Sequence, residues 1–278
     1  MKRLIVTADD YGAAREVNDA VETAHRHGIL TAASLMVAAP AAADAVARAK
    51  QMPSLRVGLH IVLVEGRPML PPSAIPDLVD ARGNFRTDMA VSAAGMFFRP
   101  KVRRQLTHEI EAQFEAFRAT GLRLDHVNTH KHFHLHPTIA STILKVGKAQ
   151  GMRAMRVPLE PREALAAAEP GSAVAPAYLT GPWARLSRWR LRRAGMVTPD
   201  AVFGLAWSGA MTAHRMRGLI AHLPEGLSEI YLHPATSGGF VGAARGYRYA
   251  EELAALTDET VVAAARAPYI RLGGFVDF

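Results

Sequence analysis

Short apolar runs alternate with helical patterns along this chain of 278 residues. Such runs predict buried strands, and their alternation with helices is typical of a parallel β/α architecture. The predicted strands are RLIVTA, ASLMV, RVGLHIVL, RLDHVNTH, RAMRVPL, EIYLHP and YIRLGGF, at 3–8, 33–37, 56–63, 123–130, 153–159, 229–234 and 269–275. We therefore expect an α/β fold, an irregular β/α barrel with mainly parallel strands.

Helical patterns fill several of the intervals between these runs. Three of them end at a glycine: 13–28 and 101–121, which place apolar side chains on one stripe, and 137–151, which begins with a proline. Two other intervals break the rhythm. Residues 64–100 contain five prolines and the run GMFF, and residues 160–200 are rich in Ala, Pro and Gly before a basic run. We expect a single domain over 1–278 with insertions near 64–100 and 160–200.

The composition is ordinary for a globular protein, with 49% hydrophobic and 21% charged residues. No apolar run is long enough to span a bilayer, and the opening MKRLIVTADD reaches aspartates too early for a signal peptide. The absence of cysteine from the sequence excludes thiolate metal ligands and cysteine nucleophiles. These features predict a cytoplasmic protein.

The net charge of +8 and the pI of about 10.1 permit attraction to an anionic membrane or to nucleic acid. Arginine dominates this charge, and its densest run is RLSRWRLRR, from Arg185 to Arg193. In organisms whose proteins are generally rich in arginine, such a positive net charge has no functional meaning, so we expect no nucleic-acid partner. A basic amphipathic stretch is nevertheless compatible with contact to lipid headgroups.

A histidine cluster occupies the stretch DHVNTHKHFHLHP at 125–137. Five of the twelve histidines fall at 126, 130, 132, 134 and 136, and Asn128 fills the gap in the alternation. Side chains at every second position of a strand share one face, and burying several imidazoles without partners is costly. The cluster therefore indicates a metal site, a substrate site or a polar strand edge. His126, deepest in the strand, suits a structural hydrogen bond, and His136 precedes a predicted helix.

Titratable or cationic side chains stand near the carboxyl ends of five predicted strands: Asp9 and Asp10, His60, His130, Arg156 and His233. Barrel enzymes place their chemistry at this end, so closing the sheet brings these groups to one mouth. An aspartate and two histidines from three strands make a ligand set for zinc, iron, cobalt, nickel or manganese. Each signal also has an ordinary interpretation, because paired aspartates cap helices and a lone strand histidine is commonly packed.

With these motifs in order, the chain resembles the YdjC/ChbG family of carbohydrate deacetylases. The likeness covers nearly the whole length and is carried by TADDYG at 7–12, VGLHIVL at 57–63, HVNTHKHFHLHP at 126–137, RVP at 156–158 and EIYLHP at 229–234. Within the family the sequence is most similar to the hopanoid-biosynthesis-associated HpnK group. The resemblance implies an irregular β/α barrel similar to the polysaccharide deacetylases, and hydrolysis of an N-acetyl group from an amino sugar.

The resemblance further implies one divalent metal ion bound by Asp10, His60 and His130. Zinc is expected in preference to magnesium, manganese, cobalt or nickel. The family usually has Asp-Ser-His where this chain has Asn128-Thr129-His130. A neutral amide cannot supply the charge of that carboxylate, so its role is open in this chain.

The same resemblance assigns the remaining chemistry to side chains around the ion. Asp9 would accept a proton from the attacking water, and Arg156 would hold Asp9 in place and limit its basicity. His233, as imidazolium, would protonate the departing amine. The substrate-binding candidates are His132, His134 and Tyr11.

The HpnK likeness implies an acetylated amino sugar carried on a hopanoid lipid, and peripheral contact with the inner membrane surface. In that case Trp183, Leu186 and Trp189 of the basic run would face lipid, with help from the run GMFFRPK. In the alternative interpretation these aromatic side chains pack on the barrel and the arginines are solvated. A homodimer is compatible with the sequence.

Other functions stay open. A metallophosphoesterase on a similar barrel would use a second metal ion and more ligands near the N-terminus. A basic protein that binds membrane or nucleic acid without catalysis would account for the charge but not for the residues at the strand ends. A glycosidase that pairs Asp9 with Asp10 is disfavoured, because neighbours on a strand point to opposite faces.

Overall fold

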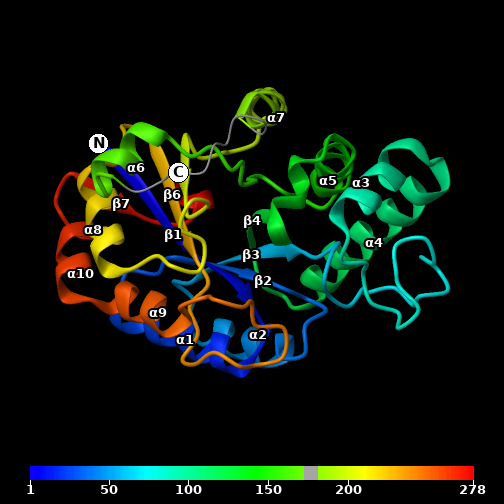
Figure 1. The fold of residues 1–278 in the computed structure, drawn as a ribbon, viewed down its shortest axis with the longest axis horizontal. Coiled ribbons are helices and arrows are strands. Elements are labelled where there is room, and N and C mark those ends of the chain that lie inside the picture. Colours follow the sequence, from blue (N-terminus) through cyan, green and yellow to red (C-terminus); the bar gives the residue numbers. More distant parts are fainter. Residues whose placement is uncertain (172–180) are drawn as a thin grey trace.

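The computed structural model describes residues 1–171 and 181–278. In this part of the chain, seven strands form one sheet in the order β4-β3-β2-β1-β6-β5, with β7 added to β1, and all paired strands run parallel (Figure 1). The strands are β1 (Lys2–Tyr11), β2 (Ala32–Leu35), β3 (Arg56–Ile61), β4 (Leu124–Thr129), β5 (Ala201–Phe203), β6 (Leu227–Leu232) and β7 (Ile270–Leu272). The predicted α/β fold with parallel strands is confirmed.

Helices connect and cover these strands. They are α1 (Arg15–His27), α2 (Ala42–Lys50), α3 (Met89–Phe98), α4 (Pro100–Ala119), α5 (Pro137–Ala149), α6 (Arg162–Ala168), α7 (Gly181–Arg193), α8 (Ala213–Ala221), α9 (Tyr249–Thr257) and α10 (Glu259–Ala265), with the 3₁₀ turns η1 (His130–Leu135) and η2 (Phe275–Asp277). Helices α1, α2 and α9 lie together along one side of the sheet, and α3, α4 and α5 form a second group (Figure 1).

The sheet curls, and the gap between β4 and β5 is crossed by single bridges and not by a ladder. Met155 pairs with Val127 of β4, Ala154 pairs with Val197, and the amide of Val202 donates to the carbonyl of Leu159 at 2.8 Å. The predicted strand at 153–159 therefore exists only as bridges, because it contains a proline that has no amide hydrogen to extend a ladder. Strand β5 is absent from the predicted strands because its three residues are too few to show a hydrophobic periodicity.

The central strand β1 is buried on both faces, as parallel sheets between helices require. Leu4, Ile5 and Val6 have no exposed surface. The apolar stripes predicted for α1 and α4 are also buried, through Val17, Val21 and Ala24 and through Val102, Leu106, Ile110, Phe114 and Phe117. The core thus lies between the apolar stripes of these helices and the buried side chains of the sheet.

The segment 64–100 is anchored to α4 and reaches the carboxyl end of β4. Glu109 of α4 accepts the amide hydrogens of Met69 and Leu70 at 2.9 and 3.0 Å. At the far end of α3, the ring of Phe97 stands edge-on to His136, with 6.0 Å between ring centres. This predicted insertion therefore borders the end of the sheet at which the histidine cluster lies.

The segment 160–200 contributes α6 and α7, and its residues 172–180 lie outside the described part. Helix α7 packs through Ala184 and Leu191, while Trp189 stays 54% exposed. Arg192 ties the helix to Asp200 at 2.8 Å. In the described ranges, none of the helices has the length and hydrophobicity needed to cross a bilayer.

Candidate metal centre

Asp9 and Asp10 lie near the carboxyl end of β1, where the pairing of the strand is irregular. The register with β2 shifts between Ala8 and Tyr11, and Asp10 has a left-handed backbone with φ of 60°. A bulge re-aims side chains at the end of a strand, and positive φ in a residue other than glycine is strained. The alternation that would send the two aspartates to opposite faces is broken at this point.

Asp10, His60 and His130 meet at the carboxyl ends of β1, β3 and β4. Oδ1 of Asp10 lies 3.2 Å from Nε2 of His60 and 3.2 Å from Nδ1 of His130. Each residue offers one ligand atom within 4.8 Å of the other two, and in the described ranges this is the one such group of three. The structure thus brings together a set of oxygen and nitrogen donors that suits zinc and related divalent ions.

The hydrogen bonds of His60 fit a metal ligand. Asn128 donates through Nδ2 to Asp9 at 3.0 Å, and its Oδ1 therefore faces Nδ1 of His60, 2.7 Å away. Because an amide oxygen only accepts, Nδ1 of His60 carries the hydrogen and Nε2 of the neutral ring has a free lone pair. This buried Nε2 has no hydrogen-bond partner, although it faces the carboxylate of Asp10. A cation shared between the two atoms would relieve that repulsion.

The electrostatics of the group favour positive charge at this place. Burial alone lowers the pKa of His60, but the carboxylates of Asp9 and Asp10 outweigh it and raise the pKa above its usual value. Burial raises the pKa of Asp10, yet the neighbouring rings of His130 and His60 hold it well below the usual value. The two aspartates therefore stay ionised and attract a cation.

Asp9 is fixed by a buried arginine. Arg156 donates to Asp9 from both terminal nitrogens, at 2.5 and 3.0 Å, and to Glu229 at 2.6 Å. Neither Arg156 nor Glu229 has exposed surface, and Thr7 donates to Glu229 at 2.8 Å. Burial raises the pKa of Asp9, but the charge and hydrogen bonds of Arg156, together with the nearby His60 and His233, outweigh it and hold the pKa far below its usual value. Asp9 is thus an ionised carboxylate beside the ligand group and outside it.

The clustered histidines do not share a single strand face. The alternation runs from His126 through Asn128 to His130, and β4 ends before the last of these. Lys131 and His132 then adopt left-handed conformations with φ of 54° and 51°, which turn the chain into η1. The prediction of one continuous face is therefore wrong beyond His130, because β4 ends at Thr129 and two consecutive left-handed residues turn the chain into η1.

Two histidines of the cluster have structural positions that confirm the prediction for them. His126 bonds to Asp125 at 2.8 Å and to Ser34 at 2.9 Å, and its ring stacks on Phe275. His136 occupies the N-cap position of α5. Neither ring reaches the ligand group.

His132 and His134 lie beside Asp9 and Arg156 and keep unused ring nitrogens. Nε2 of His132 bonds to the hydroxyl of Tyr231 at 2.8 Å, and Nδ1 of His134 bonds to Thr129 at 2.7 Å. Nδ1 of His132 and Nε2 of His134 are buried without a partner. Burial lowers the pKa of His132 well below its usual value and that of His134 to about 3, so both rings are neutral at pH 7.

His233 follows β6 at the same end of the sheet. Its amide donates to Glu252 at 2.6 Å, and its ring stands edge-on to Tyr231, with 5.7 Å between ring centres. Its charge contributes to the lowered pKa values of Asp9 and Asp10, and its Nδ1 is buried without a partner. His233 is thus near both aspartates.

Tyr11 is not part of the site. Its side chain has no exposed surface, and its hydroxyl donates to the carbonyl of Ala45 in α2 at 2.7 Å. Because the side chain is fully buried and its hydroxyl hydrogen is bonded within the protein, it is not accessible to a sugar. The assignment of Tyr11 to substrate binding is therefore wrong.

Three residues of the site are missing from the sequence-based set: Ser34, Glu229 and Tyr231. Glu229 could have been predicted from the sequence, since an acidic residue in the apolar strand EIYLHP needs a charged partner when it is buried. Tyr231, whose ring lies 4.5 Å from the guanidinium carbon of Arg156, is in the same strand. Ser34 has no such signal, because a serine is common in any strand of small residues.

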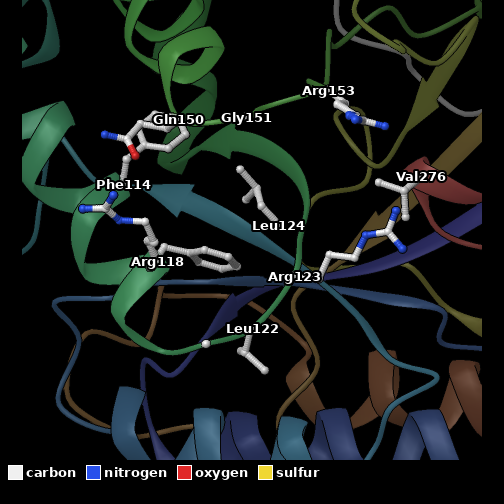
Figure 2. A pocket seen from close by; sticks show the side chains of 11 residues that line it. Phe114, Arg118, Leu122, Arg123, Leu124, Gln150, Gly151, Arg153 and Val276 are labelled. Carbon is white, nitrogen blue, oxygen red and sulfur yellow. The ribbon is translucent and has the colours of Figure 1, made fainter.

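A separate hollow of about 470 Å³ lies at the amino end of β4, opposite to the end that carries His130 (Figure 2). Phe114, Arg118, Leu122 and Arg123 are among its lining residues. Figure 2 shows the side chains of Arg118 and Arg123 pointing to opposite sides, so these charges do not converge on one ligand. The hollow is no part of the metal centre.

The curled parallel sheet, with an Asp-His-His group at its carboxyl edge, defines an α/β protein of the barrel type with a candidate metal site. The family model described as YdjC-like protein matches residues 3–267. The chain belongs to the YdjC-like protein family, as its motifs predict.

Several relatives of the chain are named carbohydrate deacetylase. The protein from Geobacillus stearothermophilus is 31% identical over 264 residues, which cover 93% of this chain and 91% of that protein. The protein from Brevibacillus brevis is 39% identical over 148 residues, which cover 52% of this chain and 56% of that protein. The match thus spans about half the length of the Brevibacillus relative.

A solved structure confirms the fold. The crystal structure of a candidate cellobiose-phosphate cleavage protein from Enterococcus faecalis V583 matches with a TM-score of 0.78. The match covers 99% of this chain and 98% of that one, at 23% identity. An identity this low supports the shared architecture alone.

Proposed function

We propose that the chain is a metal-dependent carbohydrate deacetylase, a hydrolase that removes an N-acetyl group from an amino sugar. The observation that carries the proposal is the position of Asp9. Asp9 directly precedes Asp10 in the chain and is not one of the three candidate ligands. Its carboxylate is held by Arg156 and shares Asn128 with His60. A metal site with an adjacent ionised carboxylate is what metal-assisted hydrolysis requires. The relatives named carbohydrate deacetylase support the substrate class.

Asp10, His60 and His130 would hold one divalent ion and leave other coordination positions open. Zinc is the preferred ion, because two imidazoles with one carboxylate form a typical catalytic zinc set. Magnesium, manganese, cobalt and nickel are the alternatives. Such an ion, when bound, lowers the pKa of a water molecule and polarises a carbonyl oxygen.

Proton transfer is the work of the chain's own residues. Asp9 stays ionised at neutral pH because Arg156 holds its pKa low, so that it is free to accept a proton from the attacking water. Arg156 also fixes the direction in which the carboxylate points. His233, near both aspartates, protonates the leaving amine.

Substrate recognition falls to His132 and His134. Their rings are neutral, and each has one buried nitrogen without a partner. A buried polar atom that lacks a partner is costly unless a ligand or a water molecule bonds to it. Sugar hydroxyls, which both donate and accept, suit either state of these nitrogens.

Exposed aromatic side chains support a lipid-linked substrate. Phe98 of α3 is 75% exposed and Trp189 of α7 is 54% exposed, and α5 contacts both helices. Arg193 lies over the ring of Trp189 at 5.0 Å, and Arg190 is exposed beside it. Aromatic and arginine side chains together are typical of surfaces that bind the membrane interface. The acetylated sugar is then carried on a hopanoid-like lipid at the inner membrane surface.

Acetate release is the test of the activity. The metal-loaded protein is incubated with N-acetylated glycans and with N-acetylglucosaminyl glycolipids, before and after treatment with a chelator. We expect acetate from at least one glycan or glycolipid, loss with the chelator and recovery with zinc. No acetate from any of them would contradict the proposal. Flotation with anionic liposomes, compared between wild type and Trp189→Ala, tests the membrane contact separately.

The metallophosphoesterase alternative requires a second metal ion. In the described ranges only Asp10, His60 and His130 form a group of three metal-type ligands. A bound-metal ratio near one, measured by elemental analysis, would agree with the deacetylase. A ratio near two with phosphate release would favour the alternative. Nucleic-acid binding is no part of the proposal, and a homodimer is compatible with it.

A further inference from the structure

A chain of buried hydrogen bonds runs from the C-terminal segment to the candidate ligand His60. Asp125 accepts the amide hydrogens of Phe275 and Val276 at 3.2 and 3.1 Å. From Asp125 the chain continues through His126, Ser34 and Asn128 to His60, with distances of 2.8, 2.9, 2.9 and 2.7 Å. Its members come from β2, β3 and β4 and the turn η2, so that it connects the two ends of β4.

The direction of each bond in this chain is fixed by its neighbours. Asp125 is an acceptor toward two backbone amides, so His126 donates to it from Nδ1. With the hydrogen of the His126 ring on Nδ1, Nε2 is the acceptor, and the hydroxyl of Ser34 donates to it. The hydroxyl hydrogen of Ser34 is used in this bond, so the oxygen accepts from the next member.

The hydrogen bonds of Asn128 determine which ring nitrogen of His60 carries the hydrogen. One hydrogen of its Nδ2 goes to Ser34 and the other to Asp9, at 2.9 and 3.0 Å. Both donors are thereby used, and Oδ1 accepts from Nδ1 of His60. The hydrogen of His60 is thus held on Nδ1, and the lone pair of Nε2 points to Asp10.

Burial removes the alternative partners. Ser34, His126 and Asn128 have no exposed surface, and Asp125 and His60 are 1% and 2% exposed. Water from the bulk does not reach these atoms, so a reversed bond anywhere in the chain would leave a polar group unpaired. The arrangement also suits an amide at position 128. An aspartate there would lack the two donors and would set its charge against Asp9.

We infer that Ser34 and His126 are positioning residues for the metal centre. Through Asn128 they hold His60 in the tautomer that offers Nε2 to a metal ion. The inference rests on the proposed metal site and deepens it, because it assigns a task to residues that touch neither metal nor substrate. This arrangement gives Asn128 a role that does not need the charge of an aspartate, because its amide supplies two donors and one acceptor.

The test combines a variant with a spectroscopic measurement. Ser34→Ala removes the hydroxyl, which leaves Nε2 of His126 and one hydrogen of Asn128 without a partner. Hydrogen bonds that orient metal ligands are worth roughly 10–100-fold in metal affinity. We expect Ser34→Ala to weaken zinc binding about 10-fold or more in competition with a chelator, and Ser34→Thr to restore part of the loss. Ser54→Ala is the matched control, because Ser54 bonds to the exposed side of His25 at 2.8 Å.

The tautomers themselves are read from ¹⁵N spectra of the metal-free protein at about pH 9. In the wild type we expect the hydrogen on Nδ1 for both His60 and His126, and in Ser34→Ala a mixture for His60. A wild-type spectrum with the hydrogen on Nε2 of either ring would overturn the inference, even if Ser34→Ala does not fold. Unchanged zinc affinity and tautomer in a folded Ser34→Ala would also overturn it. Wild type that binds no divalent ion would instead refute the proposed metal site.

Discussion

Arg156 and Asp9 form a two-bonded ion pair inside the sheet, with Nη1–Oδ2 and Nη2–Oδ1 distances of 2.5 and 3.0 Å. Arg156 also holds Glu229, so one buried cation serves two buried carboxylates. Such a group is stable only when it is complete, because each charge depends on the others for its partners.

Arg156→Met should therefore destabilise the fold strongly. The substitution leaves Asp9 and Glu229 buried without their cation, and losing one partner of a buried pair costs about 3–5 kcal/mol. Arg56→Met is the control, since Arg56 makes a similar two-bonded contact with Asp277 but is about one third exposed. Exposed pairs contribute about 0–1 kcal/mol. Equal losses in the free energy of unfolding, measured with urea, would contradict the interpretation of Arg156.

Asp9→Asn should separate metal binding from proton transfer. The amide keeps the shape of the side chain but cannot accept a proton, and general-base catalysis contributes roughly 10²–10⁴-fold. We expect kcat for acetate release to fall by about this factor while the zinc content, from elemental analysis, stays near that of wild type. Asp10→Asn, one residue away, should lose zinc as well. A fully active Asp9→Asn would remove Asp9 from the mechanism.

His233→Ala should change the pH profile as well as the rate. If imidazolium donates the proton to the leaving amine, the decline of kcat on the alkaline side reports its deprotonation. We expect the variant to lose this limb and to respond less to pH above neutrality. A profile that keeps its alkaline limb would assign the proton to another group.

His134 should make the fold sensitive to mild acid. Burial lowers its pKa to about 3, whereas a histidine in the unfolded chain titrates near 6.5. Between these values the unfolded chain binds a proton that the folded one excludes, so the stability present above about pH 6.5 is lost as the pH falls toward 3. A single group contributes a slope of up to about 1.4 kcal/mol per pH unit.

His134→Gln should reduce that slope, measured as the free energy of unfolding in urea from pH 7 to pH 4. The exposed His27 provides the matched variant, His27→Gln, which should leave the slope as in wild type. An unchanged slope in His134→Gln would mean that this ring is protonated in the folded protein.

The sequence predicts the fold and the ligand group well because both depend on local pattern and on strand order. Apolar periodicity places the helices α1 and α4, and the carboxyl ends of parallel strands meet wherever the sheet curls. The partners of buried polar groups are harder to predict, since they join residues far apart in the chain. Ser34 and Asn128 are 94 positions apart, and Arg156 and Glu229 are 73 apart.

Local backbone exceptions account for other errors. The left-handed residues Lys131 and His132 end the histidine alternation, and no residue type in KHF announces them. The motif TADDYG likewise does not reveal that Tyr11 turns into the core while Asp10 turns out of the strand pattern. Both features lie at the site, where backbone strain concentrates.

The most direct test is anomalous diffraction from crystals of the protein soaked in zinc. We predict one strong peak at the carboxyl end of the sheet, with ligand atoms of Asp10, His60 and His130 at about 2.0–2.2 Å and Asp9 uncoordinated. A peak elsewhere, or a protein that takes up no zinc at these three side chains, would contradict the account.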